Sequence, residues 1–274
     1  MRRRVIPGFG LSLGTTVLYL GLIVLLPLAA LILKAAEIGP SAFFAIVSTP
    51  RTLASIQVTL LTASAATLFN ATYGLALAWV LARYDFPGKR LLDALIDVPF
   101  ALPTAVAGLS LTFLFAKNGW FGRPLAEIGI SVAYTPLGII IAMAFTSLPF
   151  VVRTLQPVIE DLGRDVEEAA RSLGASDSRI FRKVIFPAIF PAFLTGCSLA
   201  FARSLGEFGA IIFIAGNQPM RTEIVALLAF IRLEEFDYPA AAVIACTMLM
   251  AAFVMLLVTN SIQAWHLRYV GRGS

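Results

Sequence analysis

The only long polar stretch in this chain of 274 residues is EDLGRDVEEAARSLGASDSRIFRKVIFPAIFP, residues 160–191. Long apolar segments precede and follow it, and 59% of all residues are hydrophobic whereas 14% are charged. A soluble domain usually carries about 25% charged residues. The composition therefore excludes a sizeable water-soluble domain, and residues 160–191 are predicted to form a loop between membrane spans.

The first half of this loop predicts a short amphipathic helix. Acidic residues gather near its start, where the helix dipole favours negative charge. The apolar residues recur at spacings of three and four: Val166, Ala169, Ala170 and Leu173. Gly174 then ends the helix, because glycine readily adopts the left-handed conformation of a helix cap.

A second short helix is predicted directly after this glycine. Ser176 or Asp177 can act as its N-cap. Its apolar face holds Ile180, Phe181, Val184 and Ile185, and its polar face holds Arg179, Arg182 and Lys183. Pro187 marks the bend into the next span, so the loop is predicted to contain a helix, a glycine corner and a second helix.

The tip of the loop has the chemistry of a docking helix. Ala169 and Ala170 permit a close backbone approach, and Glu168 offers a carboxylate to an arginine of another protein. These features suit a helix that inserts into a groove on a partner. An amphipathic helix lying on the membrane surface fits the same pattern, and the residues alone leave both interpretations open.

Outside the loop, six segments are long and apolar enough to cross a bilayer, which takes about 20 residues of helix. The first follows three arginines, as a secretory signal does, but its roughly 23 residues exceed the apolar core of such a signal. We therefore expect a retained helix. The six expected spans are 11–33, 58–81, 98–116, 137–152, 190–215 and 240–262.

The distribution of lysine and arginine predicts the orientation of these spans. With the N-terminus inside, fourteen basic residues face the cytoplasm, among them Arg2, Arg3, Arg4, Arg268 and Arg272, and six face the other side. Cytoplasmic loops of membrane proteins carry the excess of positive charge. The bias predicts both termini in the cytoplasm, together with residues 83–90 and the loop at 160–187.

The loop resembles the EAA loop of the permeases of ATP-binding-cassette (ABC) importers. The matching residues are Glu168, Ala169, Ala170, Gly174 and Pro187, while Val184 and Phe186 depart mildly from the family pattern. The resemblance implies that the loop is a coupling helix seated in a cleft of an ATPase subunit. It assigns this coupling role to Glu168, Ala169, Ala170, Leu173, Gly174 and Phe181.

Two further stretches extend the resemblance over nearly the whole chain: DVPFALPTAVAGLSL, residues 97–111, and FARSLGEFGAIIFIAGNQPMRTE, residues 201–223. They are similar to the T-type permeases of sulfate and thiosulfate importers. Molybdate and tungstate permeases share a proline-rich third span and a GEFG-like segment, so they remain an alternative. The resemblance implies an all-α fold, in which residues 1–274 form one transmembrane domain of the importer-type (MetI-like) ABC permease.

The resemblance also implies the partners of the chain. They are a second permease chain of the W type, two ATPase subunits and a periplasmic sulfate- or thiosulfate-binding protein in the bacterial inner membrane, with lipid around them and no nucleic acid. The sequence does not distinguish a heterodimer from a homodimer. No GxxxxGK[ST] phosphate loop occurs, so we expect no enzyme and no cofactor in this chain, with ATP and magnesium used by the ATPase.

Other functional classes have weaker support. Cys197 and Cys246 lie in apolar runs without the spacing of a metal or redox site, and one histidine, His266, cannot support a hydrolase or metalloprotease mechanism. An ion-coupled secondary transporter would explain the hydrophobicity but not the EAA loop. A membrane enzyme lacks catalytic candidates.

Two charges stand out within the expected fifth span, namely Arg203 and Glu207. A charge at the centre of a bilayer helix costs about 2.5–3.5 kcal/mol on insertion scales, so such residues face the bundle interior or a water-filled path. At a spacing of four, the two can pair on one helix face. They form either a buried ion pair that fixes packing or part of the translocation path, in which we also include Pro103 and Thr104.

Overall fold

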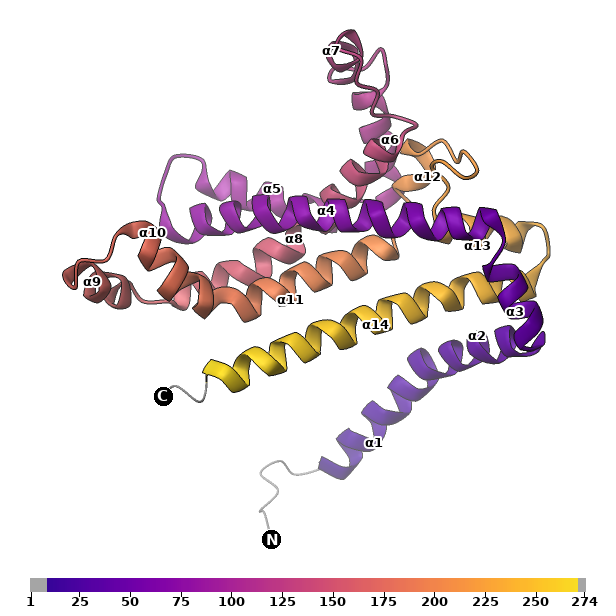
Figure 1. Ribbon diagram of the computed structural model, residues 1–274, viewed down its shortest axis with the longest axis horizontal. Helices are drawn as coiled ribbons and strands as arrows, with labels where there is room; N and C mark the ends of the chain where they lie inside the picture. Colours follow the sequence, from indigo (N-terminus) through magenta and orange to yellow (C-terminus); the bar gives the residue numbers. More distant parts are fainter. Residues whose placement is uncertain (1–8, 271–274) are drawn as a thin grey trace.

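The computed structural model describes residues 9–270, without the side chains of residue 260 and residues 263–270. Within this range every regular element is a helix (Figure 1), which confirms the predicted all-α class. Arg2, Arg3, Arg4 and Arg272 lie outside the described residues, as do the side chains of His266 and Arg268.

The helices that cross the long dimension of the molecule alternate with short connecting helices (Figure 1). The long ones are α1 (Phe9–Leu20) continued by a π-helical turn (Gly21–Leu25) and α2 (Leu26–Ala36), then α4 (Pro50–Arg83), α8 (Pro136–Asp161), α11 (Phe186–Leu205) and α14 (Tyr238–Val270). The shorter ones are α3 (Gly39–Val47), α5 (Lys89–Ala101), α6 (Thr104–Phe115), α7 (Gly122–Glu127), α9 (Arg164–Ser172), α10 (Asp177–Ile180) with a π-helical turn (Phe181–Ile185), α12 (Ile211–Ile214) and α13 (Val225–Glu234).

The core of the molecule is the packing of α4 against α8 and α11. Small residues on α4 permit this close approach. A Cβ atom added at Gly74 would lie 2.9 Å from Cγ1 of Val151 on α8, so a larger residue there would force the helices apart. α14 packs beside α11, whereas α1 and α2 stand away from the core and meet it through α14 and α3 (Figure 1).

Among the described residues, five helices are long and apolar enough to cross a membrane, or six if the bent pair of α5 and α6 forms one span. The third expected span, 98–116, is therefore wrong as a single helix, because these two helices meet at 114°. The break falls at Leu102, whose backbone is extended (φ −83°, ψ 134°). A residue before proline is disfavoured in the helical region, and Pro103 follows it.

The fifth expected span, 190–215, is also wrong as a continuous helix. α11 ends at Leu205, and a new helical turn begins only at Ile211. Conversely, the fourth expected span, 137–152, is too short, since α8 continues to Asp161 through Pro149 and Pro157. The predicted span ended where the hydropathy falls, whereas the last turns of α8 extend beyond the apolar segment.

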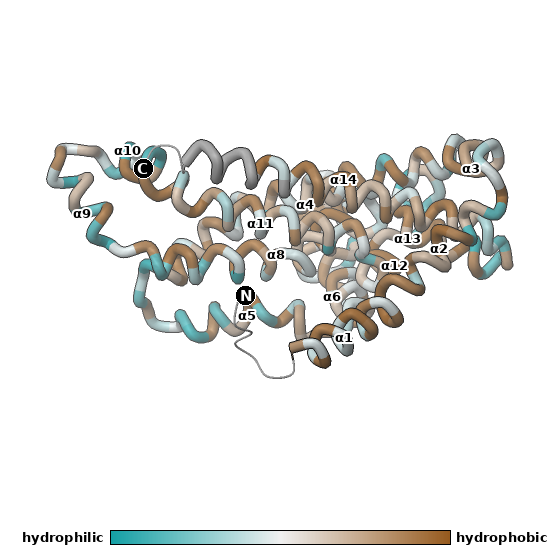
Figure 2. The backbone as a smooth tube through the Cα atoms, turned by 90° about the horizontal axis from the view of Figure 1, so that it is seen from below, coloured by the Kyte–Doolittle hydropathy of each residue, from teal (hydrophilic) through white to brown (hydrophobic). Residues whose placement is uncertain are grey.

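Polar residues gather near the two ends of the long helices, and the middle of the bundle is mostly hydrophobic (Figure 2). One end, here called the loop end, holds residues 83–90 and 160–187, joined by an ion pair between Arg83 and Glu167. The opposite end, here called the far end, holds residues 216–237. Residues 117–134 project from the side of the bundle at α7 (Figure 1) and are joined to α12 by the hydrogen bond that the Tyr134 N–H donates to the Ile214 carbonyl. Residues 83–90 and 160–187 thus lie together at one end, as predicted.

Candidate functional site

The glycine corner of the 160–187 loop has the predicted geometry. Gly174 has a φ of +81°, in the left-handed region. Its N–H donates to the Arg171 carbonyl at 2.9 Å, and the Ala175 N–H donates to the Ala170 carbonyl at 3.1 Å. These two bonds form a Schellman motif, which satisfies the last carbonyls of α9.

Most of the apolar face of α9 is uncovered, although Ala170 packs against the core. The side chain of Leu173 is 89% exposed and that of Val166 is 50% exposed. Glu168 and Ala169 are also exposed, and none of the ion pairs within residues 9–270 involves the Glu168 carboxylate. Apolar side chains that gather on one exposed helix face form a surface that a partner can cover.

α9 is attached to the bundle by the neighbouring carboxylate, Glu167. Nη2 of Arg83, in the last turn of α4, lies 2.7 Å from Oε1 of Glu167 and also donates to the Leu162 carbonyl at 2.9 Å. The guanidinium of Arg83 lies over the ring of Trp79, 5.4 Å from its centre. No local sequence pattern predicts this attachment, because its partners are 84 residues apart.

The apolar face predicted for the second helix of the loop packs on the core. Ile180 and Ile185 are buried, and Phe181 and Val184 pack against the same cluster. Ser176 occupies the N-cap position without a side-chain hydrogen bond. Asp177 instead accepts a hydrogen bond from Arg171 at 2.9 Å, and this contact raises the pKa of Arg171. Therefore α9 is tied back to the second helix across the glycine corner.

A groove of about 1120 Å³ separates α4 from this loop. Apolar side chains of α4 line one part of it, and charged side chains of the loop line the other. The residues that define it include Leu75, Trp79, Arg83, Arg164, Glu168, Arg171 and Phe181. The two predicted coupling residues Glu168 and Phe181 thus lie along one cavity.

The predicted ion pair of the fifth span exists, but at a helix break rather than within a helix. Nη1 of Arg203, in the last turn of α11, lies 2.6 Å from Oε2 of Glu207. Oε1 of Glu207 accepts the N–H of Ala210 at 3.0 Å. The side chain of Glu207 is 1% exposed and that of Arg203 is 32% exposed, so the carboxylate is buried while the guanidinium reaches the surface of the single chain.

The bend between α5 and α6 packs against this break. A Cβ atom added at Gly209 would overlap the Thr104 hydroxyl, and one added at Gly108 would overlap the backbone of Ala210. Thr104 follows Pro103 at the start of α6. The structure therefore brings all four residues that we assigned to the path into one region.

A buried polar network that the sequence analysis missed lies beside the break. The Asn70 amide donates to the Ser147 hydroxyl at 2.9 Å and to the Ala144 carbonyl at 3.0 Å. The Ser204 hydroxyl, next to Arg203, lies 3.2 Å from the Ser147 hydroxyl. These contacts join α4, α8 and α11 at the point where α11 ends.

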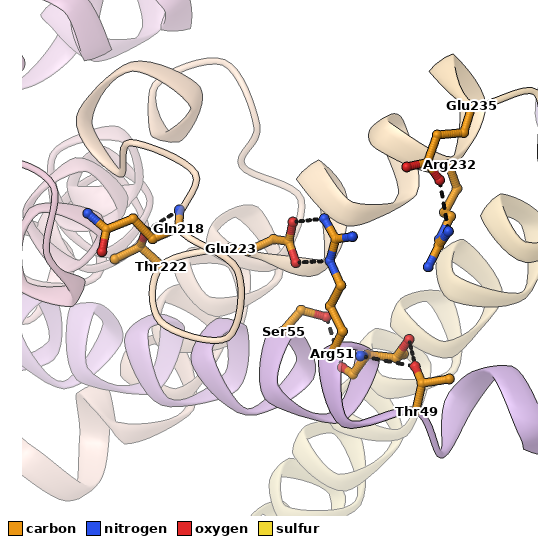
Figure 3. Close-up of polar contacts among 9 residues, drawn as sticks. Thr49, Arg51, Ser55, Gln218, Thr222, Glu223, Arg232 and Glu235 are labelled. Atoms are coloured by element: carbon orange, nitrogen blue, oxygen red, sulfur yellow. Dashed lines mark hydrogen bonds and ion pairs between the residues drawn. The ribbon is translucent and has the colours of Figure 1, made fainter.

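The far end contains a second ion pair that connects distant segments (Figure 3). Nε and Nη2 of Arg51, in the first turn of α4, donate to the two carboxylate oxygens of Glu223 at 2.8 and 2.6 Å. The neighbouring Thr222 hydroxyl donates to the Ala215 carbonyl and accepts the Gln218 N–H. The loop that links α12 and α13 is therefore tied to itself and to α4.

Comparison with known proteins identifies this architecture. Residues 74–271 match the family model of the "binding-protein-dependent transport system inner membrane component". The "sulfate transport system permease protein CysT" of Salmonella typhimurium is 54% identical over 262 residues, which cover 96% of this chain and 95% of the relative. The protein of the same name from Synechocystis is 48% identical, with 93% and 89% covered.

Solved structures agree in fold. A chain of a bacterial ABC transporter involved in the import of the acidic polysaccharide alginate superposes with a TM-score of 0.75 at 16% identity, covering 92% of this chain and 93% of that one. A chain of the MetNI methionine ABC transporter gives a TM-score of 0.60 at 14% identity, with 79% and 96% covered. The fold is that of the importer-type ABC permeases, and the chain belongs to the family of binding-protein-dependent transport system inner membrane components, as a permease and not as the ATPase.

Proposed function

We propose that this chain is the T-type permease subunit of an ATP-driven importer for sulfate and thiosulfate. The observation that supports the assignment of sulfate as substrate is the 54% identity, over nearly the full length, to sulfate permeases of two enteric bacteria. Residues 1–274 act as one transmembrane domain. The chain holds no cofactor, because ATP and magnesium are used by the partner ATPase.

The uncovered face of α9 supports a docking role for the loop end. Glu168, Ala169, Ala170, Leu173, Gly174 and Phe181 form the surface that seats in a cleft of an ATPase subunit. The exposed Leu173 side chain and the unpaired carboxylate of Glu168 within the described residues supply apolar and ionic contacts. Movement of the ATPase is thereby passed to the permease.

The partly exposed guanidinium of Arg203 supports a role in the translocation path. Arg203 offers transient compensation to the charge of a dianion, and Glu207 keeps that anion from binding too tightly. Pro103 and Thr104 lie beside this pair across the close contact with Gly209. Since six spans are few for a gated solute path, a second, W-type permease chain completes it.

The remaining assembly consists of two ATPase subunits and a periplasmic binding protein that delivers the anion. The loop end faces the cytoplasm of a bacterial inner membrane, because most of the basic residues lie there. Both termini are cytoplasmic, and the far end faces the periplasm.

Growth of a deletion strain tests the substrate. Loss of growth on sulfate and thiosulfate, with growth restored by cysteine and by the intact gene, is the expected result. Normal growth on sulfate combined with a defect in molybdenum enzymes would instead assign the chain to molybdate.

Site-specific labelling tests the orientation. In a variant without native cysteines, a cysteine at the exposed Ser172 should label from the cytoplasm and one at the exposed Arg221 from the periplasm. Arg221 is a better position than Asn217, whose backbone has a φ of +45° and whose side chain is half-buried. Labelling of both cysteines from the same side would contradict the six-span topology.

A further inference from the structure

α4 differs from the other long helices at both of its ends. Its 34 residues run without a break and span about 50 Å at 1.5 Å per residue. Arg51, in its first turn, pairs with Glu223 at the far end, and Arg83, its last residue, pairs with Glu167 of α9 at the loop end. A single helix is therefore ion-paired to a connecting segment at each side of the bundle.

The far-end contact holds its loop firmly. The Glu223 side chain is fully buried and receives both guanidinium nitrogens of Arg51 (Figure 3), a two-point geometry that fixes orientation as well as distance. Further along α4, the buried Thr59 hydroxyl accepts the N–H of Val225, the first residue of α13. Two turns of α4 thus position the connection between α12 and α13.

The connection held in this way is stiff and faces outward. Asn217 and Met220 both have positive φ values, of 45° and 62°, and the Gln218 carbonyl accepts the N–H groups of Arg221, Thr222 and Glu223. The side chains of Met220 and Arg221 are exposed at its tip. Residues other than glycine adopt such conformations only where the surroundings impose them.

The body of α4 is equally well fixed. Asn70 donates two hydrogen bonds to α8, and Gly74 allows Val151 of that helix to approach closely. By contrast, α5 and α6 are bent by 114° and α11 ends before α12 begins. Bent and broken elements absorb movement, whereas an unbroken and laterally packed helix transmits it.

We propose that α4 is a rigid connection between the loop at residues 160–187 and the far-end loop at residues 215–225. Arg51–Glu223 and Arg83–Glu167 are the positioning pairs at its two ends. The inference rests on the proposed function, because it concerns how contact with the binding protein at the far end reaches the ATPase. The far-end pair sets the position of residues 215–225, and the loop-end pair sets that of α9.

The test uses the complete importer in proteoliposomes, with the ATPase rate measured with and without sulfate-loaded binding protein. Arg51→Gln and Glu223→Gln should leave the unstimulated ATPase rate of the assembled complex intact and reduce stimulation at least fivefold. Arg83→Gln should do the same from the opposite end. Thr59→Ala removes the hydroxyl that accepts the Val225 N–H and donates to the Ser55 carbonyl. It leaves both ion pairs in place, so it should give a smaller loss, and it replaces the charge variants in the test if those do not assemble.

A double variant, changed at both ends of α4, distinguishes one connection through the helix from two separate local effects. Independent losses at sites this far apart multiply. If both pairs act through α4, Arg51→Gln with Arg83→Gln should lower stimulation no further than the worse single variant, within about twofold. A multiplied loss, or normal stimulation in both single variants, would overturn the proposal.

Matched controls remove exposed ion pairs at each end. Arg232→Gln breaks a pair with Glu235 near the far-end loop, and Lys89→Gln breaks a pair with Asp85 near the loop end. Both should retain full stimulation. If sulfate-loaded binding protein fails to stimulate the wild-type complex, the result counts against the proposed substrate. If it stimulates the wild type and the variants equally, the result counts against the role of α4.

Discussion

The helix α9, to which we assign the coupling role, and the break at residues 206–210 place their carboxylates in opposite environments. Glu168 is exposed on α9, beside a Leu173 side chain that nothing in the described chain covers. Glu207 is almost fully buried, paired with Arg203 and bonded to the backbone of Ala210. The first region presents a surface that we propose a partner covers, whereas the second is already packed within the chain.

This difference determines what a mutation can reveal in each region. A change at the buried break disturbs packing and charge balance before it disturbs transport. A change on α9 leaves the permease folded and acts on its contact with a partner. The following predictions use that distinction, from the largest expected effect to the smallest.

Loss of one charge at the break should have the largest effect. Arg203→Met leaves the Glu207 carboxylate buried without its partner, and removal of one member of a buried pair costs about 3–5 kcal/mol. We expect little assembled complex from this variant or from Glu207→Met, measured by co-purification with the ATPase.

Arg203→Met combined with Glu207→Met should recover assembly and ATP hydrolysis, because no unpaired charge remains. Sulfate uptake should nevertheless stay poor, since the path lacks its cationic group. Full uptake by the double variant would show that the pair serves packing alone.

The contact between α6 and the break should be the next most sensitive. In Gly108→Ala the new Cβ atom overlaps the backbone of Ala210, and overpacking of this kind costs about 1–3 kcal/mol. A lower melting temperature of the purified permease is expected. Gly14→Ala is the control, because nothing lies within 4 Å of that position; equal melting temperatures would contradict the packing.

Gly174→Val should affect coupling more than folding. Left-handed backbone costs a residue with a Cβ atom about 1–2 kcal/mol, and Gly174 has open space around it, so the strain acts on the corner alone. We expect an assembled complex with lost sulfate uptake. Gly163→Val, at a negative φ of −57°, is the control, and normal uptake in both variants would remove the coupling role.

Leu173→Ser should leave the stability of the isolated permease unchanged, because its side chain is 89% exposed. Its affinity for the ATPase subunit should fall severalfold, as measured in a detergent binding assay. Ser178→Ala, at an exposed position of the same loop, should bind normally. An unchanged affinity for Leu173→Ser would place the docking face elsewhere.

The sequence by itself determined the features that depend on local chain chemistry. Hydropathy located the spans that correspond to α1 with α2, to α4 and to α14, and apolar spacing located both helices of the loop. Gly174 predicted the left-handed corner, because that conformation depends mainly on the residue that adopts it. The spacing of Arg203 and Glu207 predicted that they would meet, although Glu207 lies beyond the end of α11.

Tertiary structure alone decided which distant residues meet and where helices end. Arg51 and Glu223 are 172 residues apart, and Arg83 and Glu167 are 84 apart, so no local pattern pairs them. The end of α11 at Leu205 likewise lies where α6 packs against α12. Hydropathy reports the solvent of a segment, whereas the path of its backbone depends on the neighbours that it must fit.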